Sequence, residues 1–284
     1  MVDGPDRVPV VEAGDAAIPA IGLGTWQHTG APCAETVRTA LELGYRHVDT
    51  ARAYDNEGAV GRGLSEADVD REAVFLTTKL WRSDLRAAAV VEATHESIEA
   101  LDVEYVDLLL IHWPHPRVPL GETLGAMAEL RDDGLVRHLG VANFTRDQLE
   151  RARRLADVPL VTDQVLYNPY KDQSDLLEYL AGRDLTLTAY SPLARGGLLG
   201  DDTLADVGER YGKTPAQVAL RWLVQQPGVV AIPKATGREH LEENLDVFDF
   251  ELTDAEMERV AKLRPGLRDR LYTLGPAIVR RVPF

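Results

Sequence analysis

The sequence contains very little cysteine, and this excludes two kinds of site. Cys33 is its only cysteine in 284 residues, so no disulfide can form within the chain. A metal site built from several thiolates is excluded for the same reason, and we expect no bound metal. A free cysteine is most often a small, buried, apolar residue, and we expect this of Cys33.

Long hydrophobic runs are also missing. No stretch approaches the roughly 18 uninterrupted apolar residues that indicate a membrane-spanning helix. The segment from Met1 to Val10 carries Asp3, Asp6 and Arg7, with no basic start followed by an apolar run, which is unlike a secretory signal. We therefore expect a cytoplasmic protein that has no membrane partner.

Basic residues are scarce relative to acidic ones. The chain has 46 Asp and Glu against 31 Lys and Arg, a formal charge of −15, and few of its basic residues are lysine. Such a charge repels nucleic acid and anionic lipid, so we expect no nucleic-acid partner. The acidic excess is spread along the chain, a pattern that suits a surface adapted to high salt, and we hold a halophilic origin as a hypothesis.

Short aliphatic runs alternate with longer amphipathic stretches along the whole chain. The runs predict eight strands, at Ile21–Leu23, His47–Asp49, Val74–Thr78, Val106–Ile111, His138–Ala142, Thr162–Val165, Leu185–Ala189 and Val229–Ile232. The stretches predict helices at Ala34–Leu43, Leu85–Leu101, Leu120–Asp133, Gln148–Leu155, Asp175–Ala181, Pro215–Gln226, Arg238–Asp246 and Asp254–Leu263. Eight such units in 284 residues predict a (β/α)8 TIM barrel that forms a single domain over residues 1–284.

A doubly wound open sheet is the alternative fold. Against it, no predicted strand leads into a Gly-x-Gly-x-x-Gly helix opening, and Gly61 with Gly63 is interpreted as a helix stop. Before the first strand, residues 8–19 predict a β-hairpin around Gly14–Asp15, which we expect to cap the bottom of the barrel.

Four polar residues stand at or just after the ends of predicted strands, where the active site of a barrel of this kind lies. They are Asp49, Tyr54, Lys79 and His112. A lysine in an apolar mouth needs a carboxylate partner, and Asp49 is the candidate. We expect the Lys79 ammonium to lower the pKa of the Tyr54 phenol, so that Tyr54 can donate a proton to a developing alkoxide.

His112 would donate a hydrogen bond to the same oxygen and orient the carbonyl. Each of the four residues also has a structural interpretation: an ion pair for Asp49 and Lys79, a loop aromatic for Tyr54 and a buried histidine for His112. Their convergence on one face favours catalysis.

Long motifs in a fixed order make the chain similar to the aldo-keto reductases, specifically to the branch of the 2,5-diketo-gluconate reductases. They begin at Gly22-Leu23-Gly24-Thr25-Trp26, at Gly44 to Ala51 with Tyr54 and Asn56-Glu57, at Thr77 to Trp81 and at Asp107 to Pro114. They continue at Gly140 to Phe144, at Gln164 to Tyr170, at Ala189 to Leu193, and at Ile232-Pro233-Lys234 with Glu243-Asn244.

The resemblance implies that the four polar residues are the family's catalytic tetrad and that a nicotinamide cofactor supplies the reducing power. It implies that the nicotinamide stacks on Tyr190 while Asn143 and Gln164 hold its carboxamide; the family's usual serine before the asparagine is Ala142 here. The full implied cofactor set is Gly24, Thr25, Trp26, Asp49, Asn143, Gln164, Tyr190, Ser191, Leu193, Gly196, Lys234, Thr236, His240, Glu243 and Asn244.

The same resemblance bears on the choice of cofactor. Lys234 would face the adenosine 2′-phosphate with support from Thr236, which favours NADPH. His240 stands where the family often has an arginine, and a histidine binds phosphate less well, so we expect NADPH with some tolerance of NADH. Glu243 and Asn244 would meet the adenine.

The substrate is expected to be a small carbonyl compound. Trp26, Trp81 and Trp113, together with Tyr54 and His112, would line its mouth, which suits aldehydes and ketones with hydrophobic substituents. Residues 264–284 would form a C-terminal substrate loop. The sequence shows no apolar stripe of the kind that forms a subunit interface, so we expect a monomer.

Two other functions stay open. One is a catalytically idle nicotinamide-binding sensor or accessory protein on the same fold. The other is an isomerase or aldolase in which Lys79 forms a Schiff base, which requires a neutral Lys79 although Asp49 favours its charged form.

Overall fold

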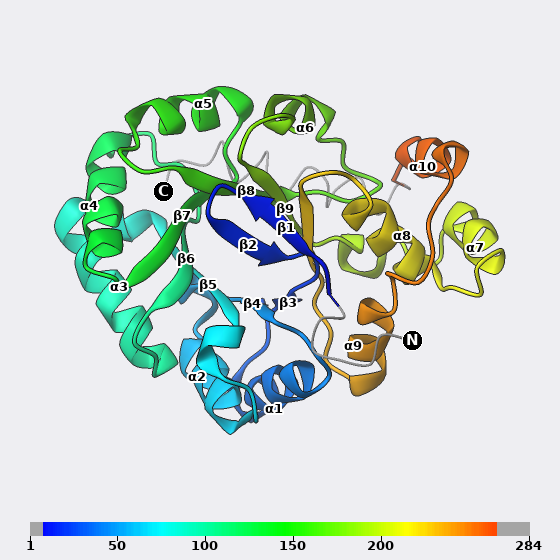
Figure 1. Cartoon of the computed structure of the whole chain (residues 1–284), viewed down its shortest axis with the longest axis horizontal. Coiled ribbons are helices and arrows are strands. Elements are labelled where there is room, and N and C mark those ends of the chain that lie inside the picture. The colour runs from blue at the N-terminus through cyan, green and yellow to red at the C-terminus, as the bar shows by residue number, and fades with distance from the viewer. Residues whose placement is uncertain (1–7, 266–284) are drawn as a thin grey trace.

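The computed structural model describes residues 8–265 and contains one sheet of eight parallel strands (Figure 1). The strands are β3 (Leu23–Gly24), β4 (His47–Asp49), β5 (Phe75–Leu80), β6 (Val106–Ile111), β7 (Val136–Ala142), β8 (Leu160–Leu166), β9 (Thr186–Tyr190) and β10 (Val229–Ile232). They follow one another in chain order. The first and last are joined by a bridge between Ile21 and Ala231, which brings the sheet round into the expected barrel.

Helices surround the sheet (Figure 1). They are α1 (Gly30–Glu42), α2 (Glu57–Glu66), α3 (Ala87–Leu101), α4 (Leu120–Asp132), α5 (Arg146–Leu155), α6 (Ser174–Leu180), α7 (Asp202–Glu209), α8 (Pro215–Val224), α9 (Arg238–Leu245) and α10 (Asp254–Ala261). Capping boxes begin three of them, at Thr145, Thr214 and Thr253. Each box gives the first turn's N–H groups a side-chain acceptor, which fixes where the helix starts.

The N-terminal hairpin lies across one end of the barrel (Figure 1). Its strands β1 (Val10–Ala13) and β2 (Ala16–Pro19) pair antiparallel around Gly14, whose φ of 62° suits glycine. Ala13, Ala16 and Ile18 are buried in one cluster with apolar residues of the barrel strands, such as Leu108 and Val161. The hairpin therefore caps the bottom of the barrel, opposite the ends that carry the chemistry.

The expected helix stop at Gly61 and Gly63 was wrong. Both glycines lie inside α2. A Cβ on Gly61 would sit 2.3 Å from the carbonyl oxygen of Leu101 in α3, and one on Gly63 would sit 2.6 Å from that of Ala34 in α1. The glycines let α2 pack closely against both neighbours. Helix α7 was also not predicted from the sequence.

Three further expectations concern a membrane span, the C-terminal segment and the single cysteine. Within residues 8–265, no helix is both long enough and apolar enough to span a membrane. The expected C-terminal substrate loop lies outside the described residues except for Arg264 and Pro265. Cys33 is buried and unbonded to sulfur, as expected.

Candidate active site

The carboxyl ends of three adjacent strands bring the four tetrad candidates together. Asp49 ends β4, Tyr54 closes the short 3-10 helix η1 (Arg52–Tyr54) that follows, Lys79 lies near the end of β5, and His112 comes directly after β6. Parallel strands place such residues at one edge, so neighbours in space come from distant parts of the sequence.

Lys79 and Asp49 form a buried ion pair. Nζ of Lys79 lies 2.6 Å from Oδ1 of Asp49 and donates to the carbonyl oxygen of Thr50 at 2.7 Å. The two side chains belong to residues that are 1% and 2% exposed. Burial is the largest single influence and opposes the charge of Lys79, but Asp49 and Tyr54 together outweigh it, and the pKa of the ammonium lies above its ordinary value. Lys79 therefore stays charged at neutral pH.

Tyr54 contacts this pair through its phenol. Nζ of Lys79 donates to the phenol oxygen at 3.3 Å. Burial raises the pKa of Tyr54 above its ordinary value of 10.0, and the ammonium, which acts in the opposite direction, does not overcome it. The expectation of a lowered phenol pKa was wrong for this state, because desolvation of the phenolate exceeds the attraction of one cation.

His112 is a neutral imidazole between two aromatic rings. Burial lowers its pKa well below 6.5, and the charges of Lys79 and Arg82 lower it further. Its ring meets those of Tyr54 and Trp81 edge to face, with centroids 5.7 and 5.1 Å apart. The neutral ring carries one N–H, so it can donate a hydrogen bond to a carbonyl oxygen without giving up a proton.

A second layer of polar side chains fixes the loops that carry the tetrad. Asn56 donates to the carbonyl oxygens of Thr25 and His28, both at 2.9 Å, and accepts from the hydroxyl of Thr50 at 2.7 Å. Glu57 accepts from the hydroxyl of Thr78. These contacts tie the loops after β3 and β4 to β5.

Several proposed nicotinamide contacts surround the tetrad. Gln164, on β8, donates to Oδ2 of Asp49 at 2.6 Å. Asn143 donates to the carbonyl oxygen of His112 at 3.0 Å and accepts from the phenol of Tyr190 at 2.9 Å. The ring of Tyr190 is half-buried at the end of β9. The three residues thus form a continuous polar wall beside the tetrad.

The loop after β9 has an unusual backbone. Ser191, Ala194 and Arg195 have φ values of 49°, 48° and 53°, in the left-handed region that side chains disfavour. Arg195 stacks on the indole of Trp26, 4.3 Å from the ring centroid. Leu193 and Gly196 lie in the same loop. The loop therefore contacts the loop after β3 across the carboxyl-terminal end of the barrel.

The residues expected at the start of the cofactor site lie on and after β3. Gly24 pairs with Asp49 in the sheet, and a Cβ on it would sit 2.8 Å from the carbonyl oxygen of Ile232. The hydroxyl of Thr25 donates to the carbonyl oxygen of Asp49 at 2.9 Å. The β3 loop is thus held against both β4 and β10.

Lys234, Thr236 and His240 are exposed at the end of β10 and the start of α9. Glu243 pairs with His240 at 3.2 Å and accepts from the hydroxyl of Thr214. Asn244 is buried. These residues lie just before α9 and along its length.

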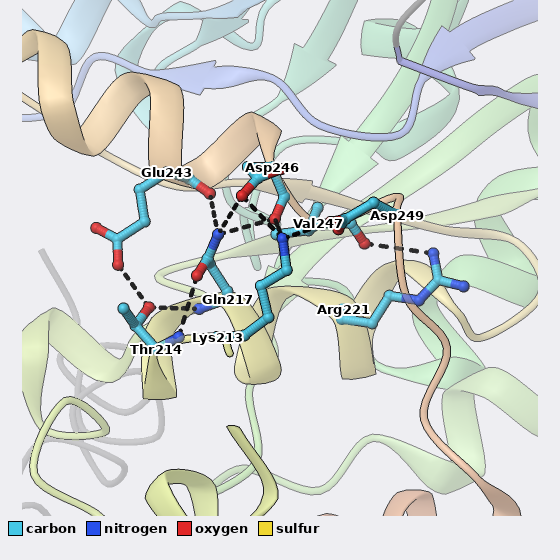
Figure 2. A network of polar contacts seen from close by, with 8 residues as sticks. All are labelled: Lys213, Thr214, Gln217, Arg221, Glu243, Asp246, Val247 and Asp249. Atoms are coloured by element: carbon cyan, nitrogen blue, oxygen red, sulfur yellow. Dashed lines mark hydrogen bonds and ion pairs between the residues drawn. The ribbon is translucent and has the colours of Figure 1, made fainter. Parts of the chain in front are cut away.

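Figure 2 shows how the end of α9 is fastened to α8. Gln217 donates to the carbonyl oxygens of Glu243 and Asp246, and Lys213 pairs with Asp246 and Asp249 at 2.8 Å each. The network holds α9 in a fixed position next to Lys234.

The expected substrate mouth holds two of the three tryptophans beside His112. Trp81 touches the His112 ring, and Trp113 is buried next in the chain. The sequence analysis missed Arg82, whose guanidinium lies 5.4 Å from the Trp113 ring centroid, and Arg195 over Trp26. For Arg82 a signal was present, since it directly follows Trp81. Among residues 8–265 there is no group of three His, Cys, Asp or Glu that could hold a metal ion.

Comparison with known proteins agrees with this geometry. Residues 20–265 match the model of the aldo/keto reductase family. An aldo-keto reductase of Mycolicibacterium smegmatis is 40% identical over 92% of this chain and 93% of its own. The methylglyoxal reductase of Escherichia coli K12 is 38% identical over 91% of this chain and 92% of its own.

Solved structures give the same result. A putative 2,5-diketo-D-gluconic acid reductase B superposes with a TM-score of 0.89 at 43% identity, over 93% of this chain and 94% of that one. A Bombyx mori aldo-keto reductase in complex with NADP superposes with a TM-score of 0.84 at 33% identity, over 90% and 92%. The chain is therefore an oxidoreductase that belongs to the aldo/keto reductase family.

Proposed function

We propose that this protein reduces aldehydes and ketones to alcohols, reversibly, with NADPH as reductant and Tyr54 as the proton donor. The observation that carries the proposal is the contact of one buried ammonium, that of Lys79, with both Asp49 and the phenol of Tyr54. When bound, the nicotinamide supplies a hydride to the carbonyl carbon. The chain's own residues then supply the proton and the geometry.

Tyr54 keeps its proton at neutral pH because burial raises its pKa, so it enters the reaction as an acid. As charge develops on the carbonyl oxygen, the phenol delivers that proton, and the adjacent Lys79 ammonium stabilises the phenolate that remains. Asp49 holds the ammonium in place. His112 donates a hydrogen bond to the same oxygen and orients the carbonyl before transfer.

The residues around the tetrad fit a nicotinamide dinucleotide. Asn143, Gln164 and Tyr190 form a polar and aromatic wall beside the reacting groups. Lys234 is exposed and has no ion-pair partner among residues 8–265, and it lies beside the amino terminus of α9, which no side chain caps. A cation and free helix N–H groups favour a phosphate there.

These features support NADPH over NADH. The 2′-phosphate would meet Lys234 and Thr236, while Glu243 and Asn244 would contact the adenine. His240 offers a weaker phosphate contact than an arginine, so we propose some use of NADH as well.

The proposed substrates are small carbonyl compounds that enter past Trp26, Trp81 and Trp113. Similar proteins are named for methylglyoxal and 2,5-diketo-D-gluconic acid, each of which contains two aldehyde or ketone carbonyls. We further propose that residues 1–284 act as one domain and as a cytoplasmic monomer, with residues 264–284 near the substrate. The high-salt hypothesis also stands, and activity and solubility that fall steadily as KCl is added would remove it.

The test is the loss of NADPH absorbance with a panel of glyoxal, methylglyoxal and benzaldehyde, with the alcohol product quantified. One alcohol formed for each NADPH consumed supports the reductase. Tight NADPH binding without turnover on a broad panel would favour the idle sensor. Borohydride trapping of substrate on Lys79 without NADPH would favour the aldolase, which the charged state of Lys79 disfavours.

A further inference from the structure

Arg82 is a half-buried arginine at the mouth of the candidate active site. It begins the short 3-10 helix η3 (Arg82–Asp84) directly after Trp81. Its guanidinium lies over the ring of Trp113, 5.4 Å from the centroid, and its Nε is buried. Arg82 thus follows Trp81, after β5, and packs on Trp113, after β6, and these are the two tryptophans next to His112.

The guanidinium of Arg82 has no carboxylate partner within the described part of the chain. No carboxylate there lies within ion-pair distance of it, and Nε has no hydrogen-bond acceptor. Asp84, on the same turn, pairs instead with Arg52 at 3.5 Å. Arg86, four residues further on, pairs with Glu122 at 2.9 Å. The chain has 46 acidic and 31 basic residues, yet none of the described carboxylates reaches Arg82.

Leaving a desolvated cation unpaired costs free energy unless a ligand compensates it. Burial lowers the pKa of Arg82, with no carboxylate contributing in the opposite direction. The charge of Arg82 also reaches His112, where it disfavours the imidazolium. The geometry gives the same relation, because Arg82 directly follows Trp81, whose ring centroid lies 5.1 Å from that of His112, and its guanidinium lies over Trp113, the residue after His112. The cation is therefore placed to meet another part of a small substrate whose carbonyl lies at His112.

We propose that Arg82 binds a carboxylate of the substrate, so that the preferred substrates of this protein are oxo acids rather than neutral aldehydes and ketones. A guanidinium matches a carboxylate with two parallel hydrogen bonds and fixes its orientation as well as its charge. The inference rests on the proposed reductase function, and the reaction at the carbonyl is unchanged. It revises the expectation of a purely apolar mouth.

The test compares two substrates of similar shape, 4-carboxybenzaldehyde and its methyl ester, under NADPH. We expect the wild type to favour the acid by about 10- to 100-fold in kcat/KM, the range expected of a hydrogen bond to a charged group. Arg82→Met keeps most of the apolar stem over Trp113 but removes the charge, and the ratio should fall towards one, chiefly through KM for the acid. Arg82→Lys should retain an intermediate preference.

Arg86→Met is the matched control. It removes one positive charge four residues further along the chain, away from the mouth of the site. The ratio of kcat/KM for the acid to that for the ester should then equal the wild-type ratio. The inference is overturned if Arg82→Met leaves the ratio unchanged, if it slows the ester as much as the acid, or if Arg86→Met shifts the ratio equally. Failure of the proposed function would look different, because the wild type would then reduce neither substrate.

Discussion

Oδ2 of Asp49 lies 2.6 Å from Nε2 of Gln164, although 115 positions separate the two residues along the chain. Oδ1 of the same carboxylate accepts from Lys79 at the same distance. One buried carboxylate thus joins the proton-donating side of the site to a residue proposed to hold the nicotinamide. If Gln164 holds the nicotinamide as proposed, we expect the position of Tyr54 to depend on that of the cofactor.

Removing Asp49 should destabilise the fold as well as stop the reaction. Asp49→Leu leaves the Lys79 ammonium buried without its partner, and we expect a loss of about 3–5 kcal/mol in the free energy of unfolding. The double variant Asp49→Leu/Lys79→Met removes both charges and should recover part of this loss, while activity stays absent. Urea unfolding measures the free energy of unfolding of the single and the double variant. A double variant as unstable as the sum of the single variants would contradict the account of the pair.

Acid should destabilise the protein below pH 6.5 because its buried histidines are neutral. Burial lowers the pKa of His47 from 6.5 to about 4, and burial followed by the charge of Lys234 lowers that of His28 to about 4. Between these values the unfolded chain binds protons that the folded chain does not. Stability is therefore fully present above pH 6.5 and is lost as pH falls towards 4.

Between pH 6.5 and about 4, each of these histidines contributes up to about 1.4 kcal/mol per pH unit to the slope of the unfolding free energy against pH. His47→Asn should therefore reduce the slope of unfolding free energy against pH by about that amount. His95→Asn, at an exposed position on α3, is the control. Equal slopes for wild type and His47→Asn would show that His47 does not carry this dependence.

Gly61 should not tolerate a side chain. Gly61→Ala places a methyl group 2.3 Å from the carbonyl oxygen of Leu101, so we expect α2 and α3 to separate at a cost of about 1–3 kcal/mol. Gly58→Ala, in the same helix, meets only the carbonyl oxygen of Ala100 at 3.7 Å and should be neutral or stabilising. The test is to compare the melting temperatures of the two variants by thermal unfolding. Similar values would argue against tight packing at Gly61.

Position 240 should set part of the cofactor preference. His240→Arg offers a bidentate, permanently charged partner to a 2′-phosphate, and KM for NADPH should fall by about threefold to tenfold, in keeping with a single exposed charged contact. KM for NADH should not change.

Lys234→Met should raise KM for NADPH selectively. Equal effects on both cofactors would place the 2′-phosphate elsewhere.

The barrel, and the meeting of the four tetrad candidates at one end of it, could be predicted from sequence because both depend on local patterns. Aliphatic runs mark the strands, and a polar residue at the end of such a run must lie at the carboxyl-terminal edge, as Asp49 and Lys79 do. Helix α2 was missed because Gly61 and Gly63 are usual helix terminators, and their packing against α1 and α3 depends on long-range contacts.

Other features depend on opposing energetic contributions or on contacts between distant residues, neither of which a local sequence pattern reveals. The direction of the pKa shift of Tyr54 results from competition between burial and the Lys79 charge. Within residues 8–265 Arg82 has no carboxylate partner, and the sequence does not reveal this because the nearby Asp84 pairs with Arg52 instead. Arg195 reaches Trp26 because three left-handed backbone positions turn its loop.

The most direct test of the central claim is a comparison of wild type with Tyr54→Phe in NADPH-dependent reduction of an aldehyde, with NADPH affinity measured in parallel by fluorescence quenching. The variant removes only the phenol hydroxyl beside Lys79. The account predicts that kcat falls by about 10²- to 10⁴-fold, as expected for loss of a general acid, while the Kd for NADPH stays within about twofold. A variant that binds NADPH normally and retains more than about a tenth of the wild-type kcat would contradict Tyr54 as the proton donor.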